Sequence, residues 1–422
     1  MYRTIAAVLA ASACVSSLQA KPSIPASNPT SPVITLGDAL DAALANSPAL
    51  EASQSSIRAA EAQRSVAGQR PNPSLDAMAE NVAGTGDFRG FRSTETTVGL
   101  SLPIELGGKR SARVAVADAQ LGRAGLDAAI ALADLRQRVT QAYNEAVAGQ
   151  RRAANAREQV GIAAEGLRVA RVRVVSGRAS PLEEQRADVV RLNAEGNAER
   201  AERSSQVALG NLGRLIGRSV AQLDNVWFDR IELMGPMRPV ETGGTLAAVA
   251  AQADLTTATA QVRLARTQRV PDVTISAAAR RLAATNDTAG VFSLSVPLPL
   301  FNNGRAGVDL ASAQRQQADA NRRLALLDAE QSIGSARVDA ANAATTARNA
   351  TGPTLAAAQE AARIARIGYR EGKFGQLDLL DAERTLAETR SAAIDALAAY
   401  HDAQARLERL AAPAPDIAKD AR

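Results

Sequence analysis

Chemically reactive side chains are rare in this chain of 422 residues. It contains one histidine, His401, and one cysteine, Cys14. Imidazole and thiolate groups are the usual protein ligands of transition-metal ions, so the sequence predicts no resident metal site. No nucleophile stands in a pattern that pairs it with a base and an orienting group, so no catalytic residue and no cofactor are predicted. We therefore do not expect an enzyme.

The run Gly107-Gly108-Lys109-Arg110 superficially resembles a phosphate-binding loop. Such a loop needs a glycine five residues before its Gly-Lys pair and a serine or threonine directly after it. This chain has Pro103 at the first of those positions and Arg110 at the last. We therefore reject a nucleotide site and predict that the two glycines allow a sharp backbone bend.

The charged residues are spread along the chain. The sequence has 49 basic and 44 acidic residues, and aromatic residues make up only 3%. Nucleic-acid binding would favour a clustered basic patch, often with aromatic side chains for base stacking. The interspersed charges instead predict solvated helix faces, and the high alanine content favours helices that approach each other closely.

The N-terminus has the pattern of a secretory signal peptide at residues 1–20, followed by an extended leader at 21–34. Cys14 lies inside the signal pattern, in a run that also resembles a lipidation site. The sequence leaves open whether Cys14 is lipidated or removed. No later apolar run reaches the length of a membrane-spanning helix, so any crossing of a membrane is expected to use strands.

Residues 35–217 form the first of two predicted repeats. A helix to about Arg70 is followed by a β-hairpin at about 72–106, where polar and apolar residues alternate. Apolar spacings of three and four then predict a helix of about 65 residues and a returning helix, joined by a turn at about 176–181. A helix of roughly 100 Å exceeds the size of an ordinary globular domain.

Residues 245–411 repeat the same order of elements roughly 195 positions later. Its hairpin is expected at about 270–301 and the turn of its helical hairpin at about 371–376. A linker at 218–244 joins the repeats, and a tail covers 412–422. The fold class is therefore mainly α with a small β part.

Each repeat should pass directly from a strand into a long helix. In the second repeat the strand is expected to continue from Phe292 to Leu300. The backbone is expected to bend near proline and glycine residues at Pro103, Gly107, Gly108, Pro297 and Gly304.

Four strands per chain cannot close a barrel, and open strand edges are not tolerated in lipid. Two chains would give about eight strands with a filled interior, whereas three would give about twelve and leave a lumen. A pore therefore favours a homotrimer. The polar strand residues would then face the lumen, among them Asp76, Glu80, Glu95 and Asp272.

This organisation resembles the TolC-type outer-membrane efflux family across nearly all of the mature chain. The segments 71–75 and 80–81 and the run Leu102-Pro103-Ile104-Glu105-Leu106-Gly107-Gly108-Lys109-Arg110 are similar to its heavy-metal branch, the cobalt–zinc–cadmium resistance components. The resemblance implies a 12-stranded trimeric barrel in the outer membrane that continues into a periplasmic helical tunnel. It also implies a periplasmic adaptor and an inner-membrane resistance–nodulation–division pump as partners.

The resemblance assigns candidate roles to both helical-hairpin turns. Gly177, Arg178, Gly372 and Lys373 would be the tips that contact the adaptor or pump, although glycine and a solvated cation also suit a plain turn. Asp378 and Asp381 match acidic positions at the closed periplasmic aperture, where Arg186 could pair with them. The alternative is that these acids stabilise the start of a helix.

The resulting hypothesis is a passive exit duct for heavy-metal cations such as cobalt, zinc or cadmium. Two alternatives remain open at this stage. The first is an exit duct for a multidrug pump or type I protein secretion, because a channel need not encode what its pump selects. The second is a periplasmic coiled-coil adaptor or scaffold without a pore.

Overall fold

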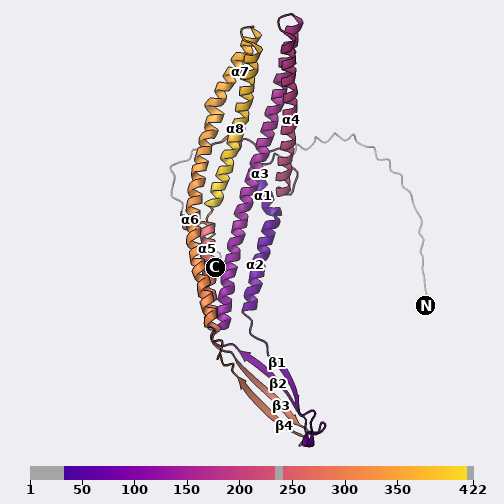
Figure 1. Cartoon of the computed structure of the whole chain (residues 1–422), viewed down its shortest axis with the longest axis vertical. Helices are drawn as coiled ribbons and strands as arrows, with labels where there is room; N and C mark the ends of the chain where they lie inside the picture. The colour runs from indigo at the N-terminus through magenta and orange to yellow at the C-terminus, as the bar shows by residue number, and fades with distance from the viewer. Residues whose placement is uncertain (1–32, 233–240, 416–422) are drawn as a thin grey trace, which may run out of the picture.

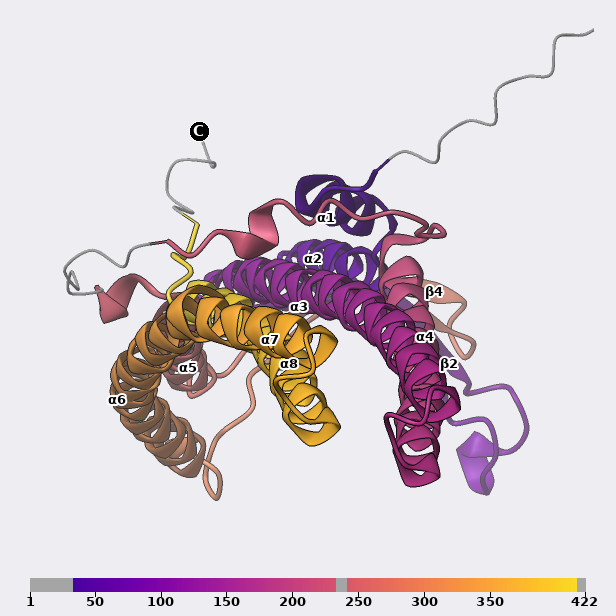
Figure 2. The ribbon, with the colours of Figure 1, turned by 90° about the horizontal axis from the view of Figure 1, so that it is seen from above.

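The computed structural model describes residues 33–232 and 241–415. The described chain is elongated, with a small sheet at one end and the turns of two helical hairpins at the other (Figure 1). Seen from above, the long helices form a curved layer (Figure 2). The prediction of a mainly helical chain with a small β part is confirmed.

The first repeat contains two short helices, two strands and two long helices. The short helices are α1 (Leu36–Asn46) and α2 (Pro48–Ala67), and the strands are β1 (Ser74–Glu80) and β2 (Glu95–Ile104). The expected single helix to about Arg70 is wrong, because it is interrupted at Ser47. Pro48 starts α2, and proline lacks the amide hydrogen that would continue α1.

The long helices of this repeat are α3 and α4. Helix α3 (Lys109–Val175) has 67 residues, and α4 (Pro181–Ile216) returns antiparallel to it. Gly149 of α3 faces α4 so closely that an added Cβ would lie 3.3 Å from the Cα of Ser205. Small residues therefore allow the close helix approach that the alanine content predicted.

The second repeat follows the same order. It contains α5 (Leu246–Thr267), β3 (Val273–Leu282), β4 (Asp287–Ser295), α6 (Arg305–Asn349), α7 (Leu355–Arg370) and α8 (Gln376–Leu410). A π-helical turn at Ala350–Thr354, which contains Pro353, separates α6 from α7. None of the described helices has an apolar stretch long enough to cross a bilayer.

The extension of the last strand to Leu300 is wrong, since β4 ends at Ser295. Pro297 and Pro299 follow, and neither has an amide hydrogen to donate to a neighbouring strand. The apolar side chains beyond β4 are exposed, with Leu298, Leu300 and Phe301 the most exposed among them.

All four strands form one antiparallel sheet in the order β1-β2-β3-β4. The register places Leu75 opposite Leu100, Leu100 opposite Ala277, and Ala277 opposite Phe292. These four residues make an apolar row, and its three large side chains are exposed. The neighbouring row consists of serines, namely Ser74, Ser101, Ser276 and Ser293. The sheet therefore has one mainly apolar and one mainly polar face.

The main core lies midway along the helices, where α1 and the segment after α4 pack on α3 and α8. Tyr143, Phe228 and His401 are buried there, with the ring centroids of Trp227 and His401 4.2 Å apart. His401 Nε2 lies 3.0 Å from the carbonyl oxygen of Phe228. This geometry suits a neutral imidazole that donates from Nε2.

We predict that His401 makes stability fall as the pH drops below 6.5. Burial lowers the pKa of His401 from the ordinary value of 6.5, so the unfolded chain takes up this proton first. The loss is at most about 1.4 kcal/mol per pH unit until the folded-state pKa is reached. Thermal unfolding of the detergent-solubilised protein at pH 7.5 and 5.5 checks this, with His401→Gln as the comparison. An equal pH response in both proteins would contradict the prediction.

Candidate functional site

The bend between sheet and helices depends on glycines in left-handed conformation. Gly107 and Gly108 have φ of 70° and 75° between β2 and α3, and Gly304 has φ of 72° directly before α6. Non-glycine residues rarely adopt this conformation. Pro103 lies in β2 opposite Thr274, whereas Pro297 lies outside β4. The equivalent positions of the two repeats therefore share the glycine but differ in how their strands end.

Charged residues in and next to the run Leu102–Arg110, called the bend motif below, stabilise the first bend through ion pairs and hydrogen bonds. Lys109 Nζ is 2.7 Å from Asp272 Oδ1, and the Lys109 side chain is only 12% exposed. The amide of Leu106 donates to the same Asp272 oxygen at 3.1 Å. Burial by itself would raise the pKa of Asp272, but the bonds from Lys109 and Leu106 hold it below its usual value. Asp272 thus joins the two repeats. Its predicted place within a strand is wrong, because β3 begins at Val273.

Glu105 and Arg110 of the bend motif also form hydrogen bonds with neighbouring parts of the fold. Arg113 makes a bidentate pair with Glu105, and this bond lowers the pKa of Glu105. Arg113 also donates to the backbone oxygen of Gln69 at 3.1 Å, while Arg110 donates to that of Gly68. The bend motif therefore fixes α2, the end of β2 and the start of α3 relative to one another.

The two hairpin turns lie at the end of the molecule opposite the sheet (Figure 1). They have the same backbone geometry. Gly177 donates to the Val174 oxygen at 3.0 Å, and Arg178 donates to that of Arg173 at 2.8 Å. In the second turn, Gly372 and Lys373 make the equivalent bonds at 3.1 and 2.8 Å, to Tyr369 and Gly368. This is the Schellman arrangement, in which a left-handed glycine ends a helix. Both cations are exposed at the ends of the hairpins.

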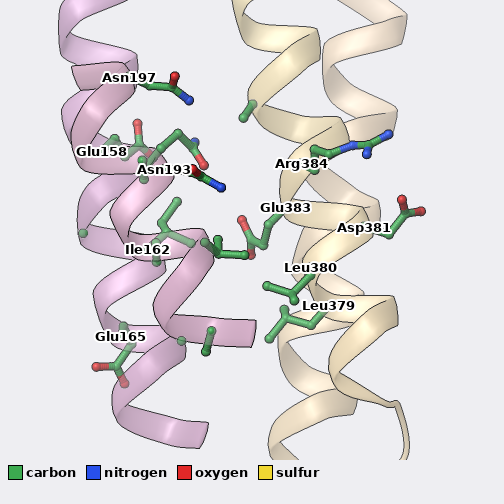
Figure 3. A pocket seen from close by; sticks show the side chains of 18 of the residues that line it. Glu158, Ile162, Glu165, Asn193, Asn197, Leu379, Leu380, Asp381, Glu383 and Arg384 are labelled. Atoms are coloured by element: carbon green, nitrogen blue, oxygen red, sulfur yellow. The ribbon is translucent and has the colours of Figure 1, made fainter. Parts of the chain in front are cut away.

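The three aperture candidates do not pair with one another within the described chain. Asp378 caps α8, since its Oδ2 accepts from the Gly375 amide at 2.9 Å. Asp381 and Arg186 are exposed, and no ion pair joins them in the described ranges. Figure 3 shows Asp381 directed away from the α3/α4 hairpin and Glu383 directed toward it. Asp378 therefore stabilises the start of α8, as the alternative interpretation predicted.

A contact that sequence reasoning missed joins the two hairpins. Tyr369 of α7 donates its hydroxyl to Glu183 Oε1 at 2.7 Å, and Gln376 donates to the Glu183 backbone oxygen at 2.9 Å. Arg173 lies 3.5 Å from the same carboxylate and 4.7 Å from the centre of the Tyr369 ring. Burial and the bond to Glu183 raise the pKa of Tyr369 to about 12, so the phenol stays protonated. We call these four residues the clamp.

A groove of about 1370 Å³ lies between the hairpins (Figure 3), and the clamp residues Tyr369 and Gln376 form part of its lining. On its wall, Asn155 Oδ1 and Gln159 Nε2 are buried and have no hydrogen-bond partner in the described residues. Arg366 pairs with Glu383 on the other wall. Separation of the hairpins would expose the two amide groups to water, which lowers the cost of parting them.

No group of three or more histidine, cysteine, aspartate or glutamate residues in the described ranges could hold a metal ion. His401 lies in the aromatic core and bonds to the backbone, as a structural histidine does. Cys14 is outside the described residues, so both alternatives for it, lipidation and removal with the signal peptide, stay open.

Comparison with known proteins places the chain in a class and then in a family. It is similar in fold to the channel protein CusC, with a TM-score of 0.77 at 19% identity over 89% of this chain and 91% of that one. It is also similar to the outer membrane protein VceC of Vibrio cholerae, with a TM-score of 0.74 at 20% identity over 90% and 96%. The fold is that of the outer-membrane channels. The family model "Outer membrane efflux protein" matches residues 39–218 and 247–412, and the chain belongs to this family.

Two relatives are named as metal-resistance proteins. The chain is 30% identical to the cobalt-zinc-cadmium resistance protein CzcC of Cupriavidus metallidurans over 351 residues, which cover 81% of each chain. It is 31% identical to the nickel and cobalt resistance protein CnrC of the same organism, over 64% of this chain and 65% of that one. The predicted family and outer-membrane location are therefore confirmed, and the chain is a transport component with a large periplasmic portion.

We predict that loss of the clamp separates the hairpin tips. Spin labels at positions 178 and 373 report the distance between them by pulsed electron resonance, and Cys14 is the only native cysteine. Tyr369→Phe and Glu183→Ala should lengthen and broaden the distance distribution, because each removes the side-chain hydrogen bond between the hairpins. Arg363→Gln, which disrupts an exposed pair with Glu360 within α7, is the matched control. Unchanged distributions in both clamp variants would refute the assignment.

Lys109→Met is predicted to destabilise the protein by about 1–2 kcal/mol, because it leaves the partly buried Asp272 carboxylate without its cation. Arg64→Met removes an exposed ion pair with Asp118 between α2 and α3 and should cost less than about 1 kcal/mol. Urea unfolding of the solubilised variants measures both effects. If the two substitutions cost the same, the Lys109–Asp272 pair has no special role at the bend.

Proposed function

We propose that this chain is the outer-membrane exit duct of a tripartite resistance–nodulation–division pump that exports heavy-metal cations such as cobalt, zinc or cadmium. The observation that carries the metal assignment is the similarity to CzcC, which extends over 81% of both chains. The family match in both repeats favours a channel over a periplasmic scaffold.

The sheet supports assembly of several copies. Strands β1 and β4 are its two edges, and each pairs with one neighbour only in the described chain. Exposed edges are costly in lipid, so the sheet requires further strands from other copies. Three copies would supply about twelve strands and a lumen. The mainly apolar face would contact lipid, and the curved layer of helices suits one sector of a tube (Figure 2).

The clamp supports a gate at the helical end of the duct. It joins the α3/α4 hairpin to the α7/α8 hairpin near their turns, where α8 also begins. In a trimer, Asp378 and Asp381 would form acidic rings there, which favour the passage of cations. Arg186 would pair with them from a neighbouring chain, and release of these contacts would open the duct.

The exposed tips support contact with partner proteins. The side chains of Arg178 and Lys373 are exposed, and the turns use only the backbone amides of these two residues. We propose that they bind a periplasmic adaptor, through which the inner-membrane pump delivers the metal ion. The metal is cargo in this scheme, and the duct has no resident cofactor.

Deletion of the gene should make cells more sensitive to cobalt, zinc or cadmium and should raise the metal content of the cells. Growth inhibition and elemental analysis measure both effects, and a plasmid-borne copy should restore the parental values. Sensitivity to drugs without sensitivity to metals would assign the duct to a multidrug pump. Loss of a secreted protein alone would assign it to type I secretion.

A further inference from the structure

All but one of the charged residues in the four strands lie on the same face of the sheet. By the register, Asp76, Glu80, Glu95 and Asp287 lie on the face that carries the serine row, and Arg280 lies there too. Arg281 is the only charged strand residue on the apolar face. Within these strands, the polar face thus has four acidic residues and a single basic one.

Arg280 contacts two of those acids. Glu80 of β1 and Glu95 of β2 are directly opposite each other in the antiparallel register. Two like charges in this position repel each other. The Arg280 guanidinium of β3 lies against both, with Nη1 2.8 Å from Glu95 Oε2 and Nη2 3.0 Å from Glu80 Oε2. Its Nε donates to the Thr97 hydroxyl at 3.0 Å, which fixes the plane of the group.

Without Arg280, this pair of carboxylates would have the chemistry of a divalent-cation site. Two opposed carboxylates supply hard oxygen ligands, and a divalent ion between them relieves their repulsion. Such a site in the lumen would retain the metal ions that the duct has to release. A channel conducts only when its binding sites are weak enough for the ion to leave.

We propose that Arg280 is a tethered counter-cation that fills the place between Glu80 and Glu95 that a divalent metal ion would otherwise occupy. The role of this arrangement in transport rests on the proposed function, whereas the metal-binding consequence of removing Arg280 does not. An arginine suits this task because its guanidinium is always protonated and its planar fork can meet two carboxylates at once.

The direct test measures Co²⁺ binding to the purified, detergent-solubilised full chain by equilibrium dialysis. At about 1 mM free Co²⁺, Arg280→Gln should bind about one ion per chain more than the wild type. Glu80→Gln combined with Glu95→Gln and Arg280→Gln should bind no more than the wild type. Arg280→Lys, which keeps the positive charge, should also match the wild type. Equal Co²⁺ binding by Arg280→Gln and the wild type would overturn the proposal.

A second variant separates this role from a purely structural one. Arg280→Cys can be purified and then blocked either with a neutral methylthio group or with a positively charged trimethylammonium-ethylthio group. The neutral product should bind the extra Co²⁺ ion and the charged product should not, although both come from one folded preparation. If neither product binds the extra ion, Arg280 is only a cross-strand ion pair.

The same variants distinguish this inference from the proposed function. If Arg280→Gln gains the Co²⁺ site but deletion of the gene leaves metal tolerance unchanged, the inference holds and the metal-efflux assignment fails. If deletion causes metal sensitivity but the variant gains no site, only the role of Arg280 fails. Expression of Arg280→Gln in the deletion strain should restore less cobalt tolerance than expression of the wild type.

Discussion

Each repeat passes from a strand to a long helix, over residues 105–108 in the first repeat and 296–304 in the second, and in both a left-handed glycine stands directly before the helix. Gly108 and Gly304 have φ of 75° and 72°, and an added Cβ at Gly304 would lie 2.7 Å from the Arg269 side chain. The Lys109–Asp272 pair then fixes the first bend against the second repeat. The directions in which α3 and α6 leave the sheet depend on these two bends.

The sheet end and the hairpin-tip end of the elongated molecule are stabilised in different ways. At the bends, backbone conformation and partly buried ion pairs leave few alternative arrangements. At the tips, the clamp joins the hairpins through a few side chains, with unpaired amide groups of Asn155 and Gln159 nearby. Parting the tips requires the loss of only a few hydrogen bonds, each worth about 1 kcal/mol. This low cost is what the proposed gate at the helical end requires.

Periodicity in the sequence was sufficient to predict the order of hairpins and long helices, because alternation and three–four spacing arise from local geometry. The break at Pro48 was visible in the sequence but was missed, and the apolar run beyond Ser295 was mistaken for strand although it contains Pro297 and Pro299. The clamp could not be predicted, since Tyr369 and Glu183 are 186 residues apart. The contact of Arg280 with Glu80 and Glu95 likewise depends on the register of three strands. The aperture and tip roles stay predictions.

Single-channel recording of the purified protein in planar bilayers tests the account most directly. The wild type should pass little current if, as we propose, the clamp keeps the helical end closed. Tyr369→Phe combined with Glu183→Gln should raise the conductance several-fold, with a reversal potential in a salt gradient that shows preference for cations. A clamp variant that conducts no better than the wild type, or that prefers anions, would contradict a cation duct gated at its helical end.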